Sequence, residues 1–148
     1  MKKQAYTMIA LLVLVGSMAV AAQAQGGSRT QLVATIPFEF SIGDKTMPAG
    51  EYTVRQVNPS SDRAVLQLRN QDGKASAMVQ MNVLIDKAKA QETASLIFNR
   101  YGNRYFFAQA WIPGNDGLEA SKTRAERATR NEMASLKPRT EAVALISR

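Results

Sequence analysis

Residues 64–85 read AVLQLRNQDGKASAMVQMNVLI, which is two alternating apolar runs separated by a turn. In the first run, Leu66 and Leu68 alternate with polar neighbours, a period of two that is typical of a half-buried strand. The second run places these residues on one face: Ala77, Val79, Met81, Val83 and Ile85. Between the runs, Asn70–Gly73 ends in Asp-Gly, a strong signal for a hairpin turn. The stretch therefore predicts a β-hairpin.

The same alternation recurs on both sides of this hairpin. Further strands are expected at 32–41, 51–57, 94–100, 103–112 and 141–147. Pro37 indicates an edge position or a bulge in the first of them. Strict alternation in 103–112 puts Tyr105, Phe107 and Trp111 on one side and Phe106, Ala108, Ala110 and Ile112 on the other. Two apolar faces favour a sheet that is covered on both sides, as in a sandwich or a small barrel.

The sequence predicts one helix, at about 118–136, after the Gly- and Asn-rich turn at 113–117. This segment is rich in Ala, Glu, Lys and Arg, and Glu126 precedes Arg130 by four residues in the favourable orientation. We therefore expect one mainly β domain over 32–148. It would be an antiparallel sandwich or a partly open barrel of about six to seven strands with a C-terminal helix.

The N-terminus has the pattern of a cleavable secretory signal peptide. Lys2 and Lys3 precede an uncharged run, and Ala22-Gln23-Ala24 supplies the small residues that a signal peptidase accepts. We predict a signal peptide at 1–24 and a flexible leader at 25–31. A retained anchor is the alternative, but the apolar run is slightly short for a bilayer. No second such run follows, so we expect a periplasmic or extracellular protein with no transmembrane segment after cleavage.

Composition restricts the chemistry of the mature chain. It has no His and no Cys, which excludes a Ser-His-Asp triad, thiolate mechanisms, a disulfide framework and the usual zinc sites. The acidic residues fall mainly in turns and on the helix, so no carboxylate pair is placed for glycoside hydrolysis. We therefore predict a protein that is not an enzyme and has no cofactor or metal site.

The chain resembles a recurrent type of small exported β-rich protein of soil bacteria. The resemblance is carried by Ile36-Pro37-Phe38-Glu39-Phe40, by Met47–Val54 and by Ala110–Gly114 before an Arg/Glu-rich segment, and it covers most of the mature chain. It implies export and a β-rich fold. That family has no assigned activity, so the resemblance implies nothing about mechanism.

Two groups of residues are candidates for ligand or surface contacts. Tyr101, Tyr105 and Trp111 belong to an aromatic group that would either form the core or line a pocket for a lipid or sugar ring. Arg124, Arg127 and Arg130 follow one another at spacings of three, which places them on roughly one face of the predicted helix. That face would either be simply solvated or meet phosphate groups.

The net charge favours an anionic partner. Two of the 19 Lys and Arg residues and none of the 12 acidic residues lie in the signal peptide, so the mature chain keeps a net charge of +5. We expect a non-catalytic binding or structural module of the cell envelope or exterior. Its partner is unknown, with an anionic envelope component or another exported protein as open alternatives. A small periplasmic lipid or sugar carrier and a hydrolase of unfamiliar mechanism are the alternative functions.

Overall fold

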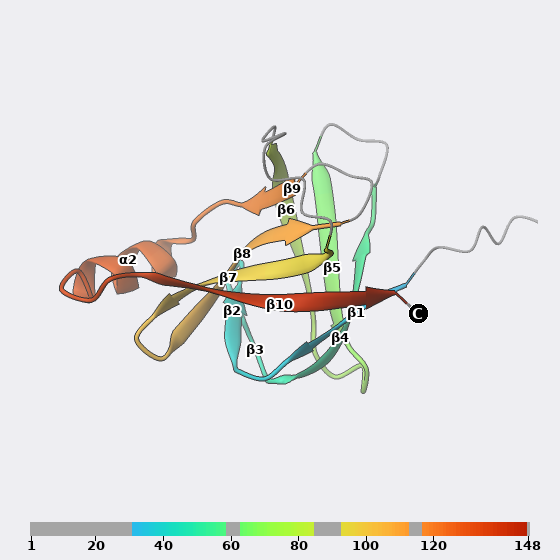
Figure 1. Ribbon diagram of the computed structural model, residues 1–148, viewed down its shortest axis with the longest axis horizontal. Coiled ribbons are helices and arrows are strands. Elements are labelled where there is room, and N and C mark those ends of the chain that lie inside the picture. Colours follow the sequence, from blue (N-terminus) through green and yellow to red (C-terminus); the bar gives the residue numbers. More distant parts are fainter. Residues whose placement is uncertain (1–30, 59–62, 85–92, 113–116, 148) are drawn as a thin grey trace, which may run out of the picture. The chain divides into compact units, whose positions relative to one another are not determined.

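Eight strands of this chain form a closed antiparallel barrel, seen in the computed structural model of Figure 1. The structure describes residues 31–58, 63–84, 93–112 and 117–147. The predicted signal peptide and nearly all of the predicted leader lie outside the described residues, as do Ile85 of the predicted hairpin and most of the turn predicted at 113–117.

The barrel closes because β9 pairs on one side with β6 and on the other with β8. In order around the barrel the strands are β8 (Arg104–Trp111), β7 (Ser95–Tyr101), β10 (Arg139–Ser147), β1 (Leu32–Ile36), β4 (Gly50–Gln56), β5 (Ala64–Asn70), β6 (Ser76–Leu84) and β9 (Gly117–Ala120). Two extra strands, β2 (Phe40–Ile42) and β3 (Lys45–Met47), form a hairpin beside β8. The fold is mainly β with a C-terminal helix, as expected, but it is a closed barrel of eight strands with two extra strands, and not a sandwich or a partly open barrel of six to seven strands.

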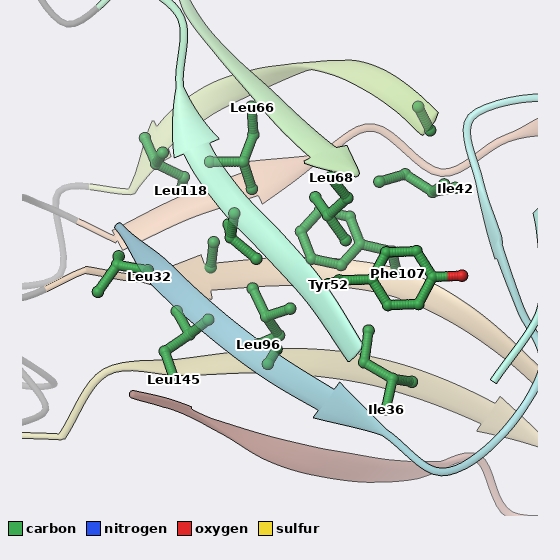
Figure 2. Close-up of a cluster of buried hydrophobic side chains, with 14 of the residues drawn as sticks. Leu32, Ile36, Ile42, Tyr52, Leu66, Leu68, Leu96, Phe107, Leu118 and Leu145 are labelled. Carbon is green, nitrogen blue, oxygen red and sulfur yellow. The ribbon is translucent and has the colours of Figure 1, made fainter. Parts of the chain in front are cut away.

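The first run of the predicted hairpin lies in the barrel interior, whereas in the second run Ala77 and Met81 are buried but Val83 is exposed. Leu66 and Leu68 on β5 are fully buried, as are Tyr52 and Val54 on β4. Figure 2 shows Leu32, Leu66, Leu96, Leu118 and Leu145 converging from five different strands. The turn at Asn70–Gly73 is also confirmed, because the amide of Gly73, at φ +73°, donates to the carbonyl of Asn70 at 2.9 Å.

A β-bulge overturns the predicted faces of β8. Ile97 lies opposite Gln109 whereas Phe98 lies opposite Phe107, so Ala108 is an extra residue in the ladder. Phe107 and Ala110 consequently both belong to the core cluster. Trp111, which strict alternation placed beside Phe107, is buried outside that cluster, against Gly117.

The predicted helix at 118–136 is wrong at both ends. Gly117–Ala120 is strand β9, and the helix α2 spans only Arg124–Glu132. Leu118 becomes a strand residue because its side chain closes the core between β6 and β8, where it is only 4% exposed. Thr123 is the N-cap of the helix, because its side-chain hydroxyl accepts a hydrogen bond from the backbone amide of Glu126 at 3.1 Å. The last predicted strand is confirmed as β10, with Leu145 buried and Ile146 exposed.

Candidate functional site

The candidate aromatic residues lie in three different environments. The ring of Tyr105 stacks on Phe38 with centroids 3.9 Å apart, at the margin of the core cluster. Tyr101 is buried outside that cluster and contacts Phe106 edge to face. Trp111 lies against Gly117 and donates its indole hydrogen to Gln109 at 3.3 Å. The structure therefore does not bring Tyr101, Tyr105 and Trp111 together into one wall.

The ring of Tyr101 lies where helix α2 docks on the tip of the β7–β8 hairpin. Glu126 and Thr129 are the buried helix residues, each 3% exposed. The Glu126 carboxylate accepts one hydrogen bond from the side-chain amide of Asn99 at 2.8 Å and another from the hydroxyl of Tyr101 at 3.2 Å. Arg104 donates to the Thr129 hydroxyl at 3.1 Å. The helix is thus held to the barrel through polar contacts as well as packing.

Burial and the Glu126 carboxylate together raise the pKa of Tyr101 above 10.0. Removal of the phenol from water is the larger cause, and the negative charge of Glu126 adds to it because it opposes a second negative charge. The positive charge of Arg130 has the opposite effect and lowers the pKa of Tyr101. The Tyr101 hydroxyl therefore stays a hydrogen-bond donor to Glu126 well into the alkaline range.

The orientation of Glu126 changes the expected electrostatics of the helix. The sequence predicted a helix-surface pair between Glu126 and Arg130, but the carboxylate turns inward to the barrel. Arg124, Arg127 and Arg130 are all exposed. Glu132, the other acid of α2, lies 3.6 Å from Arg104. The exposed side of α2 is therefore more basic than its sequence suggests.

The charges of the described residues are unevenly distributed. We define the basic end as residues 99–105 and 121–141, which are joined by the contacts of α2 with β7 and β8 and by the pairing of β10 with β7. It contains eight basic residues: Arg100, Arg104, Lys122, Arg124, Arg127, Arg130, Lys137 and Arg139. Its three acids are Glu126, Glu132 and Glu141.

Outside the basic end, the described residues are balanced in charge. Five basic residues (Lys45, Arg55, Arg63, Arg69 and Lys74) stand against five acids (Glu39, Asp44, Glu51, Asp72 and Glu119). The whole positive excess of the described chain thus lies at the basic end. Sequence reasoning identified Arg124, Arg127 and Arg130 but missed Arg100, because only the pairing of β7 with β10 brings Arg100 to the same end as Arg139.

Other site chemistries find little support within the described ranges. No group of acidic side chains there is arranged to hold a metal ion. Every buried side-chain nitrogen and oxygen in that part of the chain has a hydrogen-bond partner. Nor is any helix in the same ranges long and apolar enough to cross a membrane. The uneven charge is thus the most distinctive feature of the described surface.

Comparison of the chain with protein families, curated proteins and solved structures found no match. The resemblance to exported proteins of soil bacteria therefore stays a prediction.

Proposed function

We propose that this protein is an exported, non-catalytic binding module of the cell envelope or exterior, and that Arg124, Arg127 and Arg130 bind an anionic partner. The observation that carries the proposal is the concentration of the whole positive excess of the described residues at the basic end. A local excess of one sign attracts ligands of the opposite sign and raises their rate of association.

The way in which α2 is docked supports this role. Glu126 and Thr129 hold the helix to the barrel, so the three arginines are not needed for that attachment. The side chains of Arg124 and Arg127 form no hydrogen bond or ion pair with any other described residue. Their guanidinium groups remain available for charge-assisted hydrogen bonds to phosphate or carboxylate.

Retention on anionic vesicles tests the binding role. Arg124, Arg127 and Arg130 are replaced together by Gln in protein recovered after expression of the full chain. Since each basic residue near an anionic surface contributes about 1 kcal/mol, we expect a loss of about a hundredfold in the vesicle partition coefficient, with a weaker dependence on salt.

The matched control removes the same charge elsewhere. Arg55, Arg69 and Lys74 are exposed residues of the balanced region, and their replacement by Gln also lowers the net charge by three. Retention close to that of the parent protein is expected for this control. Equal loss in both triple variants would show that only total charge matters and would overturn the assignment to α2.

Export is tested separately. The protein recovered from the envelope fraction or the medium should begin at Gln25, as expected for cleavage after Ala24. Recovery of a chain that still starts at Met1 would contradict the predicted signal peptide.

A further inference from the structure

Arg100 on β7 and Arg139 on β10 lie directly opposite each other in the antiparallel ladder. Directly opposed residues of such a pair project to the same face of the sheet, with Cβ atoms about 4.5–5.5 Å apart. Tyr101, the next residue on β7, projects to the other face, where it contacts Glu126 of α2. The two arginines therefore form a pair on the face of the ladder that α2 does not cover.

Neither arginine is neutralised by an acid of the described chain. Neither Arg100 nor Arg139 lies within ion-pair distance of an acid in the described ranges, whereas Arg104 pairs with Glu132. Glu141 shares the face of Arg139, two residues along β10, but it is not within ion-pair distance of either arginine. Like charges directly opposite each other destabilise a sheet. A bound anion between the two guanidinium groups would relieve this repulsion.

Arg100 is already held in place for such a role. Its Nε donates to the carbonyl of Gly102 at 2.8 Å, and its Cζ lies 5.3 Å from the centroid of the Tyr105 ring. The carbonyl uses Nε, which leaves the two terminal nitrogens of the guanidinium group for a ligand. Because the group is fixed by the protein, less side-chain entropy is lost when an anion binds.

The number of donors indicates the kind of anion. A single guanidinium group satisfies a carboxylate through two parallel hydrogen bonds, so a pair of opposed arginines exceeds what one carboxylate needs. A terminal phosphate group has three oxygens and a charge between about −1.5 and −2 at neutral pH, which matches two guanidinium groups. We propose that Arg100 and Arg139 bind a terminal phosphate group, either of a lipid headgroup or of a soluble phosphate. This refines the proposed anionic partner, on a different surface from the α2 arginines.

Titration with inorganic phosphate at constant ionic strength tests the site directly. Protein from expression of the full chain should show shifts in the Nε–H NMR signals of Arg100 and Arg139 on addition of phosphate, with much smaller shifts on addition of acetate. Arg139→Gln should weaken phosphate binding by about tenfold or more, the usual effect of losing charge-assisted hydrogen bonds. Arg100→Lys should also weaken it, because it keeps the charge but loses the planar fork.

The control is Arg69→Gln, an exposed arginine in the balanced region. It should leave the phosphate affinity unchanged. The proposal is overturned if Arg139→Gln and Arg69→Gln bind phosphate equally well, or if acetate binds as tightly as phosphate. Because Arg139 is exposed at the start of β10, its replacement by Gln should leave the fold intact, and a retained NMR spectrum verifies this.

Binding to vesicles distinguishes a lipid headgroup from a soluble phosphate as the ligand. It also distinguishes the Arg100–Arg139 site from the proposed role of the α2 arginines. Preference for phosphatidic acid over phosphatidylglycerol at equal surface charge, lost in Arg139→Gln, identifies a lipid headgroup. Binding of soluble phosphate without that preference identifies a soluble ligand. The triple α2 variant should lose retention on both vesicles and keep its affinity for inorganic phosphate. If inorganic phosphate binds at Arg100 and Arg139 but the triple α2 variant is retained on vesicles like the parent protein, only the proposed role of the α2 arginines is refuted.

Discussion

The carboxylate of Glu126 and the hydroxyl of Tyr101 are joined by a 3.2 Å hydrogen bond that connects helix α2 to strand β7. The two residues are distant in the sequence, and both side chains are almost completely buried. This contact turns the helix acid away from the solvent. It therefore links the docking of α2 to the basic character of its exposed side.

Replacement of Glu126 should destabilise the protein. Glu126→Ala removes the acceptor of both Asn99 and Tyr101, and we expect a loss of about 1–3 kcal/mol in the free energy of unfolding in urea. Glu126→Gln keeps one acceptor oxygen and should lose less. Glu132→Ala is the control, since its contact with Arg104 is exposed and is expected to contribute less than about 1 kcal/mol.

Stability should fall at high pH through the buried tyrosines. Burial raises the pKa of Tyr101 and of Tyr52 above 10.0; Glu126 adds to this at Tyr101, whereas at Tyr52 the hydrogen bond with Asn70 partly opposes it. A folded-state pKa above the unfolded value means that the folded state favours the neutral phenol. The resulting stabilisation is complete below pH 10.0 and is lost as the pH rises through the folded-state pKa.

Unfolding free energies measured across this range check the tyrosine effect. Tyr101→Phe should show a shallower decline above pH 10.0 than the parent protein. An unchanged slope would mean that Tyr101 does not contribute to the alkaline transition.

A methyl group at residue 117 should collide with the indole ring of Trp111. A Cβ atom on Gly117 would lie 2.6 Å from both Cη2 and Cζ3 of that ring. We expect Gly117→Ala to lower the free energy of unfolding by about 1–3 kcal/mol, as overpacking does in other cores. In a double-mutant cycle, the same change should be less harmful when Trp111 is already Leu. Equal losses in both backgrounds would mean that the ring is not the obstacle.

Strand β9 should contribute to stability through Leu118. Leu118→Ala is expected to lower the free energy of unfolding by about 2–5 kcal/mol because the side chain is buried at the closure of the barrel. Val83, directly opposite on β6, is 42% exposed, and Val83→Ala should have a smaller effect. A change of only a few tenths of a kcal/mol would mean that the Leu118 side chain is exposed to solvent and would contradict its place at the closure of the barrel.

Much of the barrel was predictable because it is specified locally. Strands β4 and β5 follow from alternation that places Tyr52, Val54, Leu66 and Leu68 inward, and Asp72-Gly73 specifies the turn to β6. Strand β10 follows from the alternation of Val143 and Leu145 with exposed neighbours. In each case the period of two and the burial agree.

The remaining features depend on contacts between distant segments. Leu118, Glu119 and Ala120 are good helix formers, and only their pairing with β6 and β8 makes them a strand. The bulge at Ala108 has no local signal in an apolar run and is fixed by the partner strand β7. At the candidate site, the spacing of the arginines predicted that Arg124, Arg127 and Arg130 share a helix face. The inward orientation of Glu126 and the pairing of Arg100 with Arg139 could not be predicted, because each depends on contacts between segments that are distant in the sequence.

The position of β10 has a consequence for how the chain folds. Strand β10 lies between β7 and β1, so that Leu32 pairs with Ser147 and Leu96 with Val143. A chain that emerges N-terminus first from a ribosome therefore exposes one hydrogen-bonding edge of β1 until β10 arrives. Such an edge can pair with other chains. A chaperone that shields β1 during this interval would favour closure of the barrel over aggregation.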